Sequence, residues 1–378
     1  MLSDKEIEKL AEPIIRIYNE IEYELVKEIA RRFDTYETIG GSLEWQLKML
    51  QRMGVLNADC VKTIAKYSTR TDKEINEMLK KAGMANFSQS EMDSAFADNL
   101  IMVNYKQALS SSELARIINL TKTDIGKTIK LINTKCLESS SQAYMDIINK
   151  VYIETATGLR SYNEAITKAL KDMALKGIAA ATYKRIDKDG NEKLVNYSLE
   201  GIVRRDVITA VNSLANKASI EYARDIGYEY VEVSQHLGAR ATKNLDFTNH
   251  AWWQGKVYKI EGSTPQYPNL IEVTGYGNIQ GLGGINCRHR TYPFIPGVSK
   301  PQEPINQKEN AIRYEAEQDL RRMERHIREL RRMREAMRQA NNKEEAKKLK
   351  NRILAYSDKI DAFCKRNNLK RQEIREII

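Results

Sequence analysis

From Ser3 to about Leu175 the chain repeats one helix-start pattern. In each copy a Ser or Thr is followed three residues later by an acid, and apolar residues at helical spacing separate the copies. The hydroxyl and the carboxylate of such a capping box each satisfy a backbone N–H of the first helical turn. The pairs are Ser3/Glu6, Thr71/Glu74, Ser88/Glu91, Ser110/Glu113, Thr121/Asp124 and Ser161/Glu164. Because few prolines interrupt this stretch, the pattern predicts a helical N-terminal region over residues 1–178.

Near Thr182 the sequence changes to residues that favour strands. Two strand-like runs, 182–186 and 194–197, flank a turn sequence at Asp187–Gly190, which predicts a β-hairpin. A helix is expected next, because apolar residues recur three and four apart on one face until Asp225-Ile-Gly227 ends the pattern. Those residues are Val203, Val207, Val211, Leu214, Ala218 and Tyr222.

Residues 228–297 combine a strand-like run at Tyr228–Val233 with a stretch crowded with Gly, Pro, Trp and Tyr. This composition is typical of short strands joined by structured loops, so residues 179–297 are predicted to form an α+β module. Gly281-Leu-Gly-Gly284 lacks the Lys-Ser/Thr of a phosphate-binding loop, and we interpret it as a turn that needs positive φ. Any functional site is expected in this module.

Residues 298–310 contain two prolines and are interpreted as a linker. Beyond it, residues 311–378 carry a heptad-like apolar seam that Asn341-Asn342 interrupts, which predicts an antiparallel helical hairpin with coiled-coil-like packing. The seam residues are Ala316, Leu320, Met323, Ile327, Leu330 and Met337, then Ala346, Leu349, Ile353, Tyr356, Ile360 and Phe363. The predicted fold class is therefore mostly α with an α+β central module, comprising a helical N-terminal region, a small mixed module and a C-terminal basic helical hairpin.

The faces of this hairpin outside the seam are basic. Spacings of three and four place four arginines along one face of a helix, where they can follow a phosphate backbone. The four are Arg321, Arg325, Arg328 and Arg332. The formal net charge of +10 and the pI near 9.2 also favour an acidic partner. We expect sequence-independent contact with double-stranded DNA, with a solvated face balanced by Glu324, Glu329 and Glu335 as the alternative.

Composition narrows the class of protein further. A chain of 378 residues exceeds what one core usually organises, so two or three domains are expected. A charged start and the lack of any long apolar run argue against secretion and against a membrane partner. The scattered cysteines contain no C-x-x-C pair, so they predict neither a disulfide framework nor a paired-cysteine zinc site, and a reducing interior suits them. They are Cys60, Cys136, Cys287 and Cys364.

Three of the four histidines, His236, His250 and His289, fall close to Cys287 in the central module. Imidazole and thiolate are preferred ligands of zinc, which takes four of them in a closed structural site. Only one residue separates Cys287 from His289, which fits no standard zinc finger. Hydrogen bonding or packing inside the module is the alternative, so these four residues are metal candidates without an assignment. No cofactor is expected, and a structural zinc is kept as the alternative.

A catalytic interpretation would use one of these histidines as a general base beside Asp246, with Arg240 or Arg288 stabilising an oxyanion or a phosphate. The sequence contains no nucleophile elbow, phosphate-cradling loop or paired-carboxylate motif. We therefore expect no enzymatic activity and no catalytic residue. A metal-dependent nuclease built on the His/Cys cluster is the alternative.

Trp252 and Trp253 are interpreted as one turn that leads into a strand, with one indole inward. Core packing is the expectation for both rings. An exposed Trp at a partner surface is the alternative.

Three ordered motifs carry a family resemblance. They are His236-Leu-Gly-Ala-Arg240, His250-Ala-Trp-Trp-Gln-Gly-Lys-Val-Tyr258, and Gly281-Leu-Gly-Gly-Ile-Asn-Cys-Arg-His289, closing on Tyr292-Pro-Phe-Ile-Pro-Gly297. The chain resembles the phage minor capsid protein 2 family, which is related in role to the Mu F-like minor head proteins of tailed bacteriophages. The resemblance covers about residues 230–297 and, more weakly, the N-terminal region, and leaves the hairpin after Lys300 outside. Its motif residues are His236, Gly238, Arg240, His250, Trp253, Gln254, Gly255, Asn286, Cys287, Arg288 and His289.

The resemblance implies a structural minor head protein of the virion, portal-associated and aiding head assembly or DNA packaging and delivery. The partners that it implies are the phage portal protein and other head proteins. It also implies synthesis in the cytoplasm of the host bacterium. A free DNA-binding protein outside the virion is a further alternative.

Overall fold

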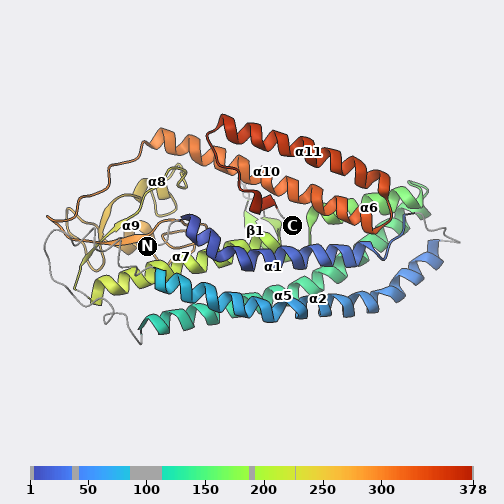
Figure 1. The fold of residues 1–378 in the computed structure, drawn as a ribbon, viewed down its shortest axis with the longest axis horizontal. Coiled ribbons are helices and arrows are strands. Elements are labelled where there is room, and N and C mark those ends of the chain that lie inside the picture. Colours follow the sequence, from blue (N-terminus) through green and yellow to red (C-terminus); the bar gives the residue numbers. More distant parts are fainter. Residues whose placement is uncertain (1–3, 36–41, 86–112, 187–191, 226, 377–378) are drawn as a thin grey trace. The chain divides into compact units, whose positions relative to one another are not determined.

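The structure is a computed structural model and describes residues 4–35, 42–85, 113–186, 192–225 and 227–376. Most of these residues lie in helices (Figure 1), which confirms the predicted mostly α fold with a small mixed module. The helices are α1 (Asp4–Ala30), α2 (Ser42–Ala85), α5 (Glu113–Ala156), α6 (Tyr162–Lys176), α7 (Leu199–Asp225), α8 (His250–Trp253), α9 (Leu270–Thr274), α10 (Gln307–Gln339) and α11 (Lys343–Arg366), with a 3-10 turn at Glu373–Glu376. The strands are β1 (Ala179–Ile186), β2 (Glu192–Ser198), β3 (Tyr230–Val233), β4 (Val257–Lys259) and β5 (Thr291–Phe294). None of the described helices combines the length and the apolarity that crossing a membrane requires.

The chain divides into two compact units. Unit 1 comprises residues 1–13, 73–126 and 204–318, and unit 2 comprises residues 14–72, 127–203 and 319–378. These boundaries differ from the contiguous domains predicted from the sequence, because α1, α2, α5, α7 and α10 each contribute residues to both units. Changes in composition mark where helices give way to strands, and they do not mark which helices pack together.

In unit 2 the core forms where amphipathic helices bury their apolar faces. Residues of α1 spaced three and four apart are almost fully buried, as the helical period requires for one face. They are Ile14, Ile17, Ile21, Leu25 and Ile29. The phenol of Tyr144 in α5 donates a hydrogen bond to the carbonyl of Met49 in α2 at 2.9 Å. Its ring lies 5.1 Å from that of Phe33, which joins the same core.

The predicted capping boxes have different outcomes. At the start of α6 the Ser161 hydroxyl accepts from the Glu164 N–H and the Glu164 carboxylate accepts from the Ser161 N–H, which confirms that box. Thr71 and Thr121 instead lie inside α2 and α5 and donate to carbonyls four residues earlier, so those two helix starts are wrong. Ser3, Ser88 and Ser110, with which the other three pairs begin, lie outside the described ranges.

Both predicted hairpins are present, the first within unit 2 and the second mostly within it. Strands β1 and β2 pair antiparallel, with Thr182 opposite Asn196, while the predicted turn at Asp187–Gly190 lies outside the described residues. Helices α10 and α11 run antiparallel beside each other (Figure 1) and share an apolar cluster. Its buried members are Leu320, Met323, Ile327, Ile360 and Cys364. The two helices are joined at Asn341, whose φ of 60° reverses the chain.

Unit 1 contains a three-stranded antiparallel sheet in the order β4-β3-β5, with Val231 opposite both Tyr258 and Pro293. Its core gathers side chains from α7, from the sheet and from the loops around it. The buried members are Ile220, Ala223, Val231, Val233, Trp253, Tyr258, Ile260, Leu270, Leu282 and Cys287. In the glycine-rich loop Gly283 has a φ of 74°, as predicted, and any Cβ on Gly281 would overlap the carbonyl of Gly275. The loops are therefore packed parts of the unit.

The predicted linker is bound to unit 1. The N–H of Gln302 donates to the Glu232 carboxylate at 2.7 Å. Helix α10 begins at Gln307, before the predicted residue 311, and its buried Asn310 accepts from the N–H groups of Gly238 and Ala239 at 2.9 Å each. Residues 298–306 are thus irregular in backbone but fixed by hydrogen bonds, which prolines do not preclude.

Candidate functional site

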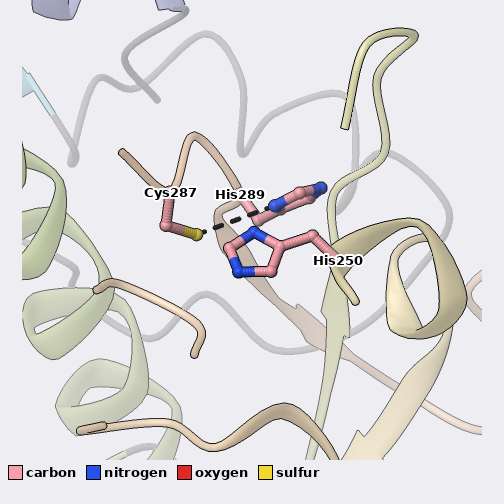
Figure 2. A group of neighbouring side chains, drawn as sticks. All are labelled: His250, Cys287 and His289. Carbon is pink, nitrogen blue, oxygen red and sulfur yellow. Dashed lines mark hydrogen bonds between the residues drawn. The ribbon is translucent and has the colours of Figure 1, made fainter. Parts of the chain in front are cut away.

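Loops and short elements of unit 1 bring His250, Cys287 and His289 together. His250 is the first residue of α8, and Cys287 and His289 immediately precede β5. One potential ligand atom from each lies within 4.8 Å of the other two. Figure 2 shows the Cys287 thiol and the two imidazole rings turned toward one another. The structure thus joins three of the four predicted metal candidates.

Hydrogen bonds fix the form of both rings. His289 Nε2 lies 3.0 Å from Gln254 Oε1, and His250 Nε2 lies 2.9 Å from the carbonyl of Gln280. The backbone N–H of His236 also donates to Gln254 Oε1, at 3.0 Å. This donor identifies that atom of the Gln254 amide as the oxygen. Since oxygens can only accept here, each Nε2 carries the proton and each Nδ1 keeps its lone pair.

The cluster is closed to solvent. His250, Cys287 and His289 are only 2%, 1% and 1% exposed. Burial, with a smaller contribution from nearby Arg240 and His236, lowers the pKa of His250 to about 4, against a hydrogen bond to the Gln280 carbonyl that raises it. Burial, then the neighbouring histidines and arginines, also lowers the pKa of His289 well below its usual range. Both imidazoles are therefore neutral near pH 7, which is the form that binds metal.

His236, the fourth candidate, lies beside the group but outside it. Its ring stacks on that of His289 with centroids 4.6 Å apart, and its Nδ1 lies 3.1 Å from the carbonyl of Leu237. Trp253 covers the cluster, with its ring 4.6 Å from that of His250 and 4.7 Å from that of His289. This indole is fully buried and donates to the Phe247 carbonyl, while Trp252 is half-buried. The core-packing prediction is thus confirmed for Trp253.

Two asparagines of α7 that the sequence analysis missed hold the Cys287 segment. The Asn212 amide donates to the Cys287 carbonyl at 2.8 Å, and the Asn216 amide donates to the His289 carbonyl at 3.0 Å. Asn216 Oδ1 also accepts from the N–H of Thr291. Both asparagines are fully buried. The sequence signal for them was a pair of amides four residues apart beside the apolar face of a helix. Buried amides need hydrogen-bond partners, so such a pair indicates a contact with another segment.

The groups proposed for catalysis bond to other parts of unit 1. Arg240 donates to the carbonyls of Gln280 and Ile285, at 3.2 and 2.7 Å, and so holds the glycine-rich loop. Arg288 lies 3.5 Å from the Glu317 carboxylate. The Asp246 carboxylate accepts from the N–H and hydroxyl of Thr248, which hold the pKa of Asp246 below its usual value. The described contacts of Asp246 therefore do not pair it with a histidine as a general base would require.

The sequence of the chain matches that of a known protein family. The sequence profile described as Phage minor capsid protein 2 matches residues 2–365. The chain belongs to this family. A relative named "Structural protein" from Lactococcus phage LL-H is 27% identical over 351 residues, covering 88% of each chain. Another "Structural protein", from Lactococcus phage mv4, is 34% identical over 116 residues, which is 30% of this chain and 94% of the relative. No solved structure matches the chain significantly.

The Phage minor capsid protein 2 match extends further than the sequence motifs indicated. Because it reaches residue 365, it includes α10 and nearly all of α11, which the motif comparison had left outside. The basic hairpin is therefore part of the family's sequence and not an added segment. This corrects the predicted limits of the resemblance.

Several motif residues of this minor capsid family member have a conformational role. Gly238, Gly255 and Asn286 have φ of 86°, 67° and 57°, a region that favours glycine and asparagine. A Cβ on Gly255 would also meet the Gln235 side chain, with its nearest atom 2.5 Å away. These residues position the loops that carry the histidines.

The structure places the four arginines of the predicted DNA-binding stripe in different surroundings. Arg325 is exposed, and Arg321 is half-buried. Arg328 donates to the Arg375 carbonyl. Arg332 is 5% exposed and pairs with the buried Glu22 carboxylate. Arg332 is therefore unavailable to DNA in this fold, because its part of the α10 face packs inside unit 2.

Proposed function

We propose that the chain is a portal-associated structural protein of the phage head that aids head assembly and DNA packaging or delivery. The observation that carries the proposal is the family match over residues 2–365, together with relatives named "Structural protein". The capsid role places the protein in the virion, and portal association and DNA handling are the finer parts of the proposal.

The burial of the His/Cys cluster supports a structural role over the nuclease alternative. A metal-dependent nuclease needs an open coordination position for water and access for a phosphodiester. Side chains that are at most 2% exposed offer neither in this conformation. Incubation with linear and circular DNA, with and without divalent metal and chelator, should leave the DNA intact. Metal-dependent cleavage that His250→Gln abolishes would favour the nuclease.

Coexpression with the portal protein of the same phage tests the portal proposal. We expect the two to copurify as one complex in size-exclusion chromatography, and we expect mass spectrometry to find the chain in purified virions. Virions without the chain would contradict the head-protein proposal, whereas virions that contain it without portal binding would contradict only portal association. An unrelated phage's portal protein is the matched control.

For contact with DNA, we propose a basic surface on α11 and, as a separate contact, the exposed Arg325 of α10. Lys347, Lys350 and Arg352 lie within two turns of α11 and are exposed. None of these three side chains forms an ion pair with any described residue. They flank Leu349 and Ile353, which pack into the hairpin, so the charges point away from its apolar cluster. Such groups can neutralise phosphates without breaking an internal contact.

The salt dependence of DNA binding tests this surface. Replacing Lys347, Lys350 and Arg352 by Gln should weaken binding to all sequences and flatten the slope of log affinity against log salt by about 0.9 for each phosphate that is no longer neutralised. A control variant replaces three lysines of unit 2 that lie near acids, the exposed Lys62 and Lys135 and the half-buried Lys168, by Gln. Because both variants lose the same net charge, equal slopes would refute a specific role for α11.

A further inference from the structure

We propose that His250, Cys287 and His289 bind one zinc ion through Nδ1, Sγ and Nδ1, as a structural site that cross-links α8 to the segment before β5. Zinc is the commonest ion held by this mixture of thiolate and imidazole in closed sites. The inference is independent of portal or DNA binding, because the site lies wholly within unit 1.

The distances between the ligand atoms agree with tetrahedral coordination of one ion. With Zn–S of about 2.3 Å and Zn–N of about 2.0–2.1 Å, a tetrahedron places sulfur and nitrogen about 3.6 Å apart. Cys287 Sγ and His289 Nδ1 lie 3.6 Å apart. His250 contributes an atom within 4.8 Å of both, so a shift of roughly 1 Å brings it to the same geometry.

The surrounding hydrogen bonds are those that a zinc site needs. Histidine ligands generally donate their second ring N–H to a carbonyl or carboxylate, which fixes the tautomer and aims the free lone pair at the metal. Here Gln280 and Gln254 supply these oxygens to His250 and His289. Asn212 in turn holds the Cys287 carbonyl from α7. All three ligands are therefore oriented before any ion arrives.

The charges near the cluster determine which ligand contributes most to zinc binding. Arg240 and Arg288 lie close enough to lower the pKa of His289, so they oppose an added cation. A Cys287 thiolate offsets part of this repulsion, and we expect the site to depend on it more than on either imidazole. Zinc takes a fourth ligand in a closed structural site, and His236, whose ring stacks on that of His289, is the neighbouring imidazole that can supply it.

The same thiol and imidazole have another interpretation. A cysteine beside a histidine that a third group orients is also the arrangement of a nucleophilic pair. Cys287 and His289 are both 1% exposed, however, and a substrate cannot reach a sulfur closed off in this way. Burial is compatible with a structural metal and not with turnover.

The full-length protein, purified from zinc-supplemented cells, provides the test. Elemental analysis should give about one zinc per chain, and chelation should lower the melting temperature, because binding energy is folding energy in such sites. Cys287→Ser should lose the zinc. Cys364→Ser, at a buried free cysteine of the hairpin cluster, and His326→Gln, also outside unit 1, should retain it. A zinc-free wild type, or Cys287→Ser with full zinc content, would overturn the proposal.

Cobalt substitution keeps the test decisive if Cys287→Ser fails to fold. The metal-free wild type, titrated with Co²⁺, should give the intense absorption of tetrahedral cobalt with a thiolate charge-transfer band, saturating at about one equivalent. His250→Gln should alter the ligand-field bands, since it replaces one nitrogen ligand. Absence of the thiolate band in the wild type would also overturn the proposal.

Discussion

Arg332→Met should strongly destabilise unit 2. The Arg332 guanidinium lies 3.5 Å from the Glu22 carboxylate, and the two side chains are only 6% and 2% exposed. The same guanidinium donates to the carbonyls of Ala174 and Leu175 at the end of α6, at 2.9 and 3.4 Å. A methionine fills much of the volume but leaves a buried carboxylate without its cation.

The expected loss follows from that buried charge. Removing one partner of a buried ion pair costs about 3–5 kcal/mol, far more than the pair itself contributes. At about 2–4 °C per kcal/mol for domains of roughly 150–250 residues, this lowers the melting temperature by about 6–20 °C. Glu22→Gln in the same chain removes the charge and keeps an oxygen for the Ile178 N–H, which donates to Glu22 at 3.0 Å. The double variant should therefore lose only about 1–3 kcal/mol, from the unpaired α6 carbonyls.

Thermal unfolding followed by circular dichroism measures these differences. Arg338→Met is the control, because that side chain is 57% exposed and its pair with Glu335 is expected to contribute at most about 1 kcal/mol. If Arg332→Met melts within a degree or so of the control, or if the double variant is no more stable than the single one, the buried-charge reasoning is wrong.

Other outcomes follow from the same structure. In the metal-free folded protein the pKa of His250 is about 4, below the usual value of about 6.5 for an unfolded chain. Between these pH values the unfolded chain binds more protons than the folded one. The free energy of unfolding should therefore fall as the pH is lowered from about 6.5 toward 4. A melting temperature that stays flat over this range would contradict it, and His250→Gln should reduce the slope. Gly281→Ala should destabilise the protein by more than about 1 kcal/mol in urea unfolding, because its Cβ would overlap the Gly275 carbonyl. Gly126→Ala should instead stabilise it by about 0.5–1 kcal/mol, because Gly126 lies inside α5 with open space around it. Ser161→Ala should cost about 1 kcal/mol because a helix cap is removed, while Thr123→Ala inside α5 should be neutral or stabilising, and equal effects would contradict the assignment of the cap.

The capping boxes show how far local sequence predicts the fold. Ser161 and Thr121 are both followed by an acid three residues later, yet only Ser161 begins a helix. A hydroxyl can accept from the N–H groups of a first turn or donate to a carbonyl of the preceding turn, and local sequence does not distinguish the two. What continues α5 through Thr121 is its buried apolar face, including Ile117 and Ile125, which depends on the packing of other helices.

The two candidate sites differ for a similar reason. Closeness in sequence and shared ligand chemistry were enough to select His250, Cys287 and His289, because the loops that carry them fold within one unit. The arginine stripe was selected by helical spacing. Such spacing shows which residues share a face of the helix, but it does not show which segment packs against that face. Arg332 meets the end of α6, a segment distant in sequence. Asn212 and Asn216 were missed because amides beside an apolar helix face look like solvent-facing residues until their partners are known.

The hydrogen bonds of Asn310 bear on how chains of this family can exchange segments during evolution. A crossover in residues 298–310 would join the motif-bearing loops of one parent to a foreign α10. If the foreign helix carries no Asn at this position, the N–H groups of Gly238 and Ala239, which lie in the first histidine motif, lose the side-chain oxygen that accepts from both. Recombinants should therefore persist when the crossover falls after Asn310, inside α10, so that the loops inherit the first turn of their own helix, or when the foreign helix has Asn at the same position. The unit of inheritance would be the loops together with that turn.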